Sequence, residues 1–197
     1  ERFDADRAVW ALPLPALRQI TFVPPLPALQ AEAVREVPYT PITKVFLKVT
    51  RAFWEEDGLP ASMWTDSPLD RVFPLRAAGG GIEGLVCFLD GAQAVALDAV
   101  PAAAVEERVL TELARLRPST KGAVSLAEVV SWAADPLAGG AYPAFAPTQI
   151  TRLRAAMAAP HARVTFAGEH ASVVAPGIEG ALEAAERAVD ELRSMVA

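Results

Sequence analysis

Short apolar runs and two-residue alternation recur along the chain, and both are typical of β-strands. The clearest alternation places Val45, Leu47 and Val49 on one face. Lys48 and Thr50 fall on the other face, which indicates a half-buried strand. The predicted strands are residues 7–12, 44–50, 62–65, 71–75, 85–89, 126–132 and 163–166.

Longer segments repeat their apolar residues every three or four positions, as helices do. Proline at the first position predicts helix starts at Pro27 and Pro101, and Pro118 ends the second helix. A short helical turn is expected at 16–20. The last helix, 178–196, is expected to pack on a core along its whole length through an apolar stripe made of Leu182, Ala185, Val189, Leu192 and Val196.

This mixture of strands and helices predicts an α/β or mixed α+β class, with no internal repeat. The run Gly79-Gly80-Gly81 lies between two predicted strands and is expected to form a hairpin-type loop. A phosphate-binding loop is not favoured there, because the required helix and lysine are missing. A Gly- and Pro-rich loop is predicted over 133–147.

Composition and charge exclude several classes of function. The net charge is −6 and the pI is near 5.0, which argues against nucleic acid as a partner. No apolar run approaches the roughly 18 residues of a membrane span. Cys87 is the single cysteine, so an internal disulfide is impossible, no metal site is expected, and a buried position in its apolar run is predicted.

The first predicted strand has no obvious local partner. A buried strand needs neighbours, so we expect the chain to begin within a larger protein. No targeting signal is visible, and a cytoplasmic location is the expectation, although a preceding part could carry such a signal.

The segment 164–180 combines a strand, a polar turn and a helix start. Gly168 and Gly177 permit close backbone approach, and a helix N-terminus favours an anionic or electron-rich ligand. From the residues alone, a ligand site and an ordinary glycine–helix junction both remain open.

Arg163-Val164-Thr165-Phe166-Ala167-Gly168-Glu169-His170, followed by Gly177-Ile178-Glu179-Gly180-Ala181, resembles the C-terminal flavin-binding motif of the flavin-containing amine oxidase superfamily. That superfamily includes monoamine oxidases, polyamine oxidases, lysine-specific histone demethylases and L-amino-acid oxidases. Further stretches resemble it in the same order, at 4–14, 20–27, 44–54 and 132–142.

The resemblance implies the C-terminal part of a two-domain FAD-linked fold. Residues 1–23 and 132–197 would belong to the FAD-binding domain, and 24–131 would form the substrate-binding domain with a mixed sheet. The helix-starting Gly-x-Gly-x-x-Gly fingerprint that cradles the FAD pyrophosphate is absent. A second polypeptide, or an unseen part of the same one, is therefore expected to supply that half.

The resemblance also implies which residues contact FAD. Gly168 and Glu169 match the positions beside the ribityl–pyrophosphate part. Gly177 and Ile178 match the helix start that faces the flavin ring. Trp132 matches an aromatic position beside the isoalloxazine.

Substrate contacts follow in the same way. Tyr142 matches one wall of the aromatic cage around the substrate amine, whereas the position of the second wall is Gly177, which has no side chain. Arg76 is a candidate clamp for a substrate carboxylate, with an ordinary surface charge as its alternative. The lysine that commonly assists the reaction with oxygen is replaced by Arg18 or Gln19, and neither is a titratable amine.

The implied function is an FAD-dependent oxidase, part of a heteromer, that converts an L-amino acid or related amine to an imine and yields hydrogen peroxide. The alternatives are a polyamine or other amine oxidase, a flavin dehydrogenase or desaturase, and a non-catalytic subunit of a flavoenzyme complex. A hydrogen-bonded structural role is expected for His170, and a solvated position for His161.

Overall fold

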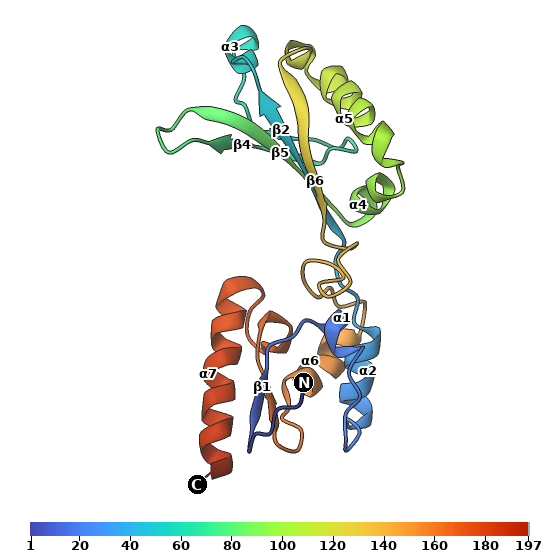
Figure 1. Cartoon of the computed structure of the whole chain (residues 1–197), viewed down its shortest axis with the longest axis vertical. Helices are drawn as coiled ribbons and strands as arrows, with labels where there is room; N and C mark the ends of the chain where they lie inside the picture. Colours follow the sequence, from blue (N-terminus) through green and yellow to red (C-terminus); the bar gives the residue numbers. More distant parts are fainter. Residues whose placement is uncertain (197) are drawn as a thin grey trace. The chain divides into compact units, whose positions relative to one another are not determined.

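The computed structural model describes residues 1–196, and the chain forms two compact units (Figure 1). The first unit is built from Glu1–Thr40 together with the chain from Asp135 onward, and the second is Pro41–Ala134. Residues 24–40, expected with the middle segment, thus belong to the first unit, because helix α2 (Ala28–Glu36) packs on helix α6 (Gln149–Ala158).

The second unit contains a five-stranded sheet in the order β3-β4-β5-β2-β6, with every neighbouring pair antiparallel. Gly79–Gly81 lies in the turn of the β4–β5 hairpin, which confirms the predicted loop. The segment Gly79 to Gly84 leads into strand β5 and starts no helix, so it is not the helix-starting glycine fingerprint of a dinucleotide site. The strands are β2 (Ile42–Val49), β3 (Met63–Trp64), β4 (Arg71–Arg76), β5 (Ile82–Asp90) and β6 (Val124–Ser131).

Helices α4 (Gly91–Asp98) and α5 (Ala102–Leu116) pack on this sheet (Figure 1). α5 buries Val105, Val109 and Leu113, which recur every fourth residue as on one face of a helix. Cys87 is fully buried beneath them, as expected. The buried side chains of this core are Val45, Leu47, Phe53, Ala61, Leu69, Val72, Leu85, Cys87, Leu89, Ala94, Leu97, Val105, Val109, Leu113 and Ala123.

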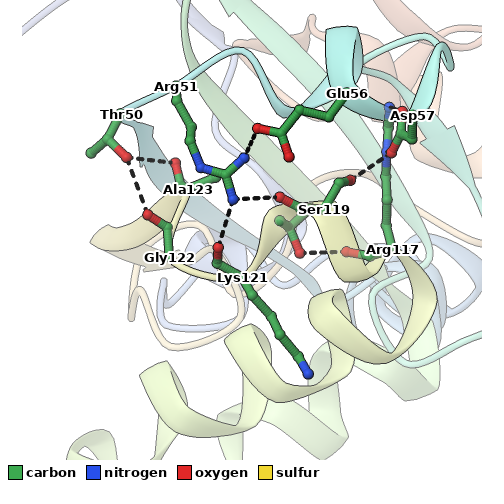
Figure 2. Close-up of polar contacts among 10 residues, drawn as sticks. Thr50, Arg51, Glu56, Asp57, Arg117, Ser119, Lys121, Gly122 and Ala123 are labelled. Atoms are coloured by element: carbon green, nitrogen blue, oxygen red, sulfur yellow. Dashed lines mark hydrogen bonds and ion pairs between the residues drawn. The ribbon is translucent and has the colours of Figure 1, made fainter.

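A buried arginine joins the short helix α3 (Phe53–Asp57) to the end of α5 (Figure 2). Arg117 is 4% exposed, and both oxygens of Asp57 accept from its guanidinium, at 2.7 and 2.6 Å. The guanidinium also lies over the Phe53 ring, at 4.8 Å from its centre. Arg117, followed by the Ser119 hydroxyl, holds the pKa of Asp57 well below its usual range.

The first unit contains a parallel pair of short strands, β1 (Ala8–Trp10) and β7 (Val164–Phe166). Helices α6 and α7 (Gly177–Val196) pack on β7, α2 packs on α6, and α1 (Leu14–Leu17) packs on α2. The buried apolar residues of its main core cluster are Leu14, Leu17, Ala33, Val34, Val37, Leu153, Met157, Phe166, Ala171 and Ala184. One 3₁₀ turn, η2 (Glu169–Ala171), lies in this unit. Another, η1 (Pro118–Thr120), lies in the second unit.

The prediction that the apolar stripe of α7 packs on a core is wrong for the described chain. Leu182 is 57% exposed and Val189 is 45% exposed. The helix instead buries its small residues, Gly180, Ala184 and Ala188. The reason is steric, because residues without a large side chain let the helix approach the turn behind it closely. Val196 lies in the helix, and its side chain lies outside the described part.

Three helices were not predicted from the sequence. α3 has five residues and α4 eight, which is too short for a clear period. α6 begins after Thr148, which has a φ of 70° and offers no side-chain cap. In the described part of the chain, no helix is long and apolar enough to cross a membrane.

Candidate functional site

The segment that resembles the flavin motif folds as a strand, a tight turn and a long helix. β7 ends at Phe166, Gly168 follows with a φ of 101°, and η2 comes next. Gly177 starts α7 with a φ of 76°. L side chains rarely adopt these positive φ angles, so both turns require glycine.

A carboxylate joins the two ends of this turn. Oε1 of Glu169 accepts a hydrogen bond from the backbone N–H of Gly177, at 2.9 Å. A negative charge is favourable at a helix N-terminus. Four of the five predicted flavin contacts, Gly168, Glu169, Gly177 and Ile178, therefore lie together in one strand–turn–helix segment.

The start of α7 is open to its surroundings. Ile178 is 79% exposed and Val174 is 71% exposed. A Cβ added to Gly177 would have no heavy atom within 4 Å among those of the chain. A flat, uncharged ring system fits this surface, because it offers backbone and apolar side chains. The residues present are therefore compatible with a flavin at the helix start.

Gly180 is needed for a different reason. A Cβ at this position would lie 2.0 Å from the carbonyl oxygen of Ala175 and 3.0 Å from the Ser172 side chain. The loop before the helix therefore packs directly on the helix backbone. The resemblance includes Gly180, but only the structure shows this contact.

Arg187 holds the motif in place and was not singled out from the sequence. Its Nη2 donates to the carbonyls of Phe166 and Ala171, each at 3.0 Å, and Nη1 donates to that of Ala158, at 3.0 Å. The two carbonyls that accept hydrogen bonds from Nη2 flank the turn that contains Gly168 and Glu169. The only sequence signal was its spacing of four residues from Glu183 and Glu191, to which it is paired.

A cavity of about 190 Å³ lies beside this turn. Arg154, Glu169 and His170 line it together with the apolar Phe145 and Ile150. His170 is 5% exposed, and its Nε2 has no hydrogen-bond partner among the described residues. Burial lowers the pKa of His170 to about 4, so the imidazole is neutral near pH 7. The expected hydrogen bond of His170 is not made by Nε2.

His161 was expected to be solvated and is half-buried. Its Nε2 lies 2.9 Å from the carbonyl oxygen of Pro24, and its ring packs on the edge of Phe22. Among the described residues there is no group of three His, Cys, Asp or Glu side chains that could hold a metal ion.

Tyr142 lies in the same unit as the motif. It is 38% exposed, and its carbonyl accepts from the N–H of Thr40, at 2.8 Å. The neighbouring Gly140 fits because a Cβ there would lie 2.8 Å from the Thr40 oxygen. The backbone around Tyr142 is thereby fixed, while its side chain remains accessible.

Trp132 and Arg76 belong to the second unit. Trp132 is 40% exposed, and its backbone N–H donates to the Ile42 carbonyl, at 2.9 Å. Arg76 is exposed at the end of β4, where Nη1 donates to the Gly80 carbonyl in the hairpin turn, at 3.0 Å. The contact with Gly80 supports the alternative of a surface charge for Arg76.

The two residues at the position of the usual lysine have backbone partners. Arg18 donates from Nε to the Val34 carbonyl, at 2.8 Å, and from Nη2 to that of Val37, at 2.6 Å. These bonds satisfy carbonyls at the end of α2. The amide of Gln19 donates to the Pro136 carbonyl, at 3.0 Å.

The chain combines a strand–turn–helix segment with a mixed α/β fold, as the resemblance implies. A model of the flavin-containing amine oxidoreductase family matches residues 1–193, so the chain belongs to this family, and its cofactor is FAD. The resemblance found in the sequence is thereby confirmed.

The relatives include L-amino-acid oxidases from snakes. One from Bothriechis schlegelii is 32% identical over 84% of this chain and 34% of its own length. Another, from Bothrops moojeni, is 28% identical over 96% of this chain and 39% of its own length. The chain therefore spans little more than a third of these relatives.

Solved amine oxidases share the fold. A cyclohexylamine oxidase from Brevibacterium oxydans IH-35A matches with a TM-score of 0.81 and 21% identity, over 96% of this chain and 43% of that one. A redesigned putrescine oxidase matches with a TM-score of 0.82 and 22% identity, over 97% of this chain and 43% of that one.

Proposed function

We propose that this chain is the C-terminal part of an FAD-dependent oxidase that converts an L-amino acid or a related amine to an imine, with hydrogen peroxide formed on reoxidation. The observation that carries the proposal is the turn closed by Glu169 and Gly177, together with sequence identity near 30% to L-amino-acid oxidases. When bound, FAD supplies the hydride acceptor for the carbon that bears the amine.

The residues of the motif have distinct roles in this proposal. Gly168 and Glu169 hold the ribityl–pyrophosphate part, and the helix start at Gly177 and Ile178 faces the flavin ring. A helix N-terminus stabilises negative charge on a reduced flavin. Trp132 lies beside the isoalloxazine. Arg187 keeps the turn in position through the carbonyls on either side of it.

The domain roles follow from the same assignment. Residues 1–23 and 132–197 contribute to the FAD-binding domain, and the middle of the chain forms the substrate-binding domain. The dinucleotide-binding half, with its helix-starting glycine fingerprint, comes from a second polypeptide or from another part of the same one. The chain purified alone is expected to hold no stoichiometric flavin. A yellow preparation with flavin close to one per chain contradicts this part of the proposal.

The substrate side of the site favours an amino acid over a simple monoamine. Tyr142 supplies one aromatic wall, whereas Gly177 leaves the second wall without a ring. A carboxylate on the substrate provides binding energy that an aromatic pair would otherwise supply. Arg76 is the candidate partner of that carboxylate, although it contacts Gly80 in the free chain.

The test uses the complete flavoenzyme and anaerobic flavin bleaching. L-amino acids, putrescine and cyclohexylamine are compared by the rate at which flavin absorbance disappears, and peroxide is measured after oxygen is admitted. Faster bleaching by an L-amino acid supports the proposal. Bleaching by the diamine alone assigns a polyamine oxidase, and no bleaching by any amine assigns a non-catalytic subunit.

Arg18 and Gln19 favour a second candidate, a flavin dehydrogenase or desaturase. Both side chains are bonded to backbone carbonyls, and neither can act as the amine that assists the reaction with oxygen. The dehydrogenase predicts rapid bleaching followed by slow reoxidation in air and fast reoxidation by an artificial quinone. If the protein is an oxidase, oxygen should reoxidise the flavin rapidly. The Gln19→Lys variant should then change the rate of reoxidation by oxygen and leave the rate of bleaching by the substrate unchanged.

A further inference from the structure

Helices α4 and α5 cover the five-stranded sheet of the second unit, but they pack mainly on different strands. α4 packs on β2 and β5, whereas α5 packs on β6 and on the turn η1. A cavity of about 550 Å³ remains between the two helices, and Pro68 and Leu69, in the loop before β4, also line it. Its volume lies in the range of about 300 to 1,000 Å³ that is typical of small-molecule sites.

The lining of this cavity divides into an apolar part and a polar part. The buried part is aliphatic and comes from the loop before β4, from β5 and from both helices, as Leu69, Leu89, Leu97 and Val109. The polar part is exposed or half-buried and consists of Gln93, Glu107, Arg108, Thr111 and Glu112. An apolar base with a few polar groups beside it is the usual composition of a small-molecule site.

The charged residues of the lining differ in whether they already have a partner. Glu112 accepts two hydrogen bonds from Arg115, at 2.9 and 2.7 Å, so its charge is compensated. Within residues 1–196, neither Glu107 nor Arg108 forms an ion pair. The two do not pair with each other, because adjacent residues of a helix do not face one another. The cavity therefore offers one free carboxylate and one free guanidinium beside an apolar base.

These two charges select among apolar ligands. An apolar carboxylate would gain a bond to Arg108 and be repelled by Glu107, and an apolar amine would gain Glu107 and be repelled by Arg108. A molecule that carries an ammonium group and a carboxylate next to an apolar side chain satisfies both residues. An apolar α-amino acid has this composition.

We propose that the cavity between α4 and α5 is a binding site for an apolar α-amino acid. The guanidinium of Arg108 binds the carboxylate of the ligand, and the carboxylate of Glu107 binds its ammonium group. The side chain of the ligand lies on Leu69, Leu89 and Leu97, where burial of apolar surface stabilises the complex. The inference goes beyond the proposed function, which assigns no ligand to these residues.

The test is isothermal titration calorimetry on the full chain with three ligands that share one apolar side chain. L-Leucine carries both charges, 3-methylbutylamine lacks the carboxylate, and 4-methyl-2-oxopentanoate lacks the ammonium group. L-Leucine is expected to bind. The amine and the oxo acid are expected to bind about tenfold more weakly, because each loses one charge pair and keeps one repulsion.

Two variants assign the binding to this cavity. Arg108→Gln should weaken L-leucine by about tenfold without weakening the amine, and Glu107→Gln should weaken L-leucine by about tenfold without weakening the oxo acid. Both positions are exposed, so the fold is retained. The matched control is Glu106→Gln, an exposed position of α5 whose Oε1 accepts from the Leu126 N–H, at 3.1 Å, a bond that glutamine can keep. This control should bind L-leucine as the wild type does.

Each other outcome overturns the inference. Equal binding of L-leucine and the amine assigns a site for organic cations, and equal binding of L-leucine and the oxo acid assigns a site for carboxylates. Absence of L-leucine binding, or L-leucine binding that Arg108→Gln and Glu107→Gln both leave unchanged, removes the cavity as a site. The proposed function is tested separately by flavin bleaching, which these titrations do not measure.

Discussion

His170 lies directly behind the turn that contains Glu169, and its burial has a measurable consequence. The side chain is 5% exposed, and no described group accepts or donates at Nε2. A protonated imidazole would lose its hydration there without gaining a partner. The folded protein therefore contains the neutral form of His170. The free energy of unfolding thus depends on pH through a residue at the edge of the candidate flavin site.

The stability of the first unit is expected to fall on mild acidification. The pKa of His170 is about 4 in the folded state and about 6.5 in an unfolded chain. Its contribution is therefore fully present above pH 6.5 and is lost as the pH falls towards 4, because only the unfolded chain takes up the proton. The loss between pH 7 and pH 5 is about 2 kcal/mol.

Urea unfolding of the wild type and of His170→Gln across this range measures the effect. The variant should be less dependent on pH between 7 and 5, where the carboxylates with lowered pKa, such as Asp57, do not yet titrate. Equal slopes for the two proteins would show that His170 is not the group responsible.

Helix α7 illustrates how an element obtains its orientation from its smallest residues. Hydrophobicity alone places Leu182 and Val189 inward, yet the structure buries Gly180, Ala184 and Ala188. Close approach of the Ala175 carbonyl to the helix backbone requires a position without Cβ. The same helix start takes the hydrogen bond of Glu169, so packing and the candidate site are coupled.

Gly180→Ala is expected to destabilise the first unit, although alanine is the better helix former. Propensity alone would stabilise a helix by about 1 kcal/mol. The added Cβ would lie 2.0 Å from the Ala175 oxygen, so the loop must move, at a cost of about 1 to 3 kcal/mol. Urea unfolding gives the sign, and flavin retention in the complete enzyme reports the displaced loop.

The matched control for this variant is Glu186→Ala, at an exposed position further along the same helix. It should change the free energy of unfolding by less than about 0.5 kcal/mol. A stabilised Gly180→Ala protein with normal flavin content would mean that the contact with Ala175 does not constrain the helix.

At the scale of the whole molecule, the second unit is one continuous segment of the chain, and it lies in the sequence between the two segments that form the first unit. The core of Pro41–Ala134 is made entirely from its own residues. Its two ends are neighbours, because Thr43 pairs with Ser131 and the Trp132 N–H donates to the Ile42 carbonyl. The buried ion pair between Asp57 and Arg117 also lies within this unit.

Residues 41–134 expressed alone are therefore expected to fold cooperatively. The measurements are thermal unfolding by circular dichroism and the reaction of Cys87 with a thiol reagent, which should be slow until the fragment unfolds. The control is a fragment ending at 123, which lacks β6 and leaves the edge of β2 unpaired. A non-cooperative transition and a reactive thiol in the longer fragment would show that the unit depends on the rest of the chain.

Local pattern was sufficient for most of the elements. The alternation at Val45, Leu47 and Val49 and the repeat at Val105, Val109 and Leu113 are each set by the chain geometry of one strand or helix. Helices α3, α4 and α6 were missed because short helices depend on the surface that they cover. The proposed flavin motif was found through its resemblance to a family motif, because the spacing of its glycines alone left an ordinary glycine–helix junction open.

The sequence by itself determined the family, the cofactor class and the glycines of the turn, because those depend on residues close together in the chain. Only the tertiary structure decided that Arg187 holds the turn and that Arg18 and Arg76 bond to backbone carbonyls. It also decided that α7 turns its large apolar residues outward. These properties depend on which backbone groups approach one another across the fold, and no local pattern of hydrophobic and polar residues contains that information.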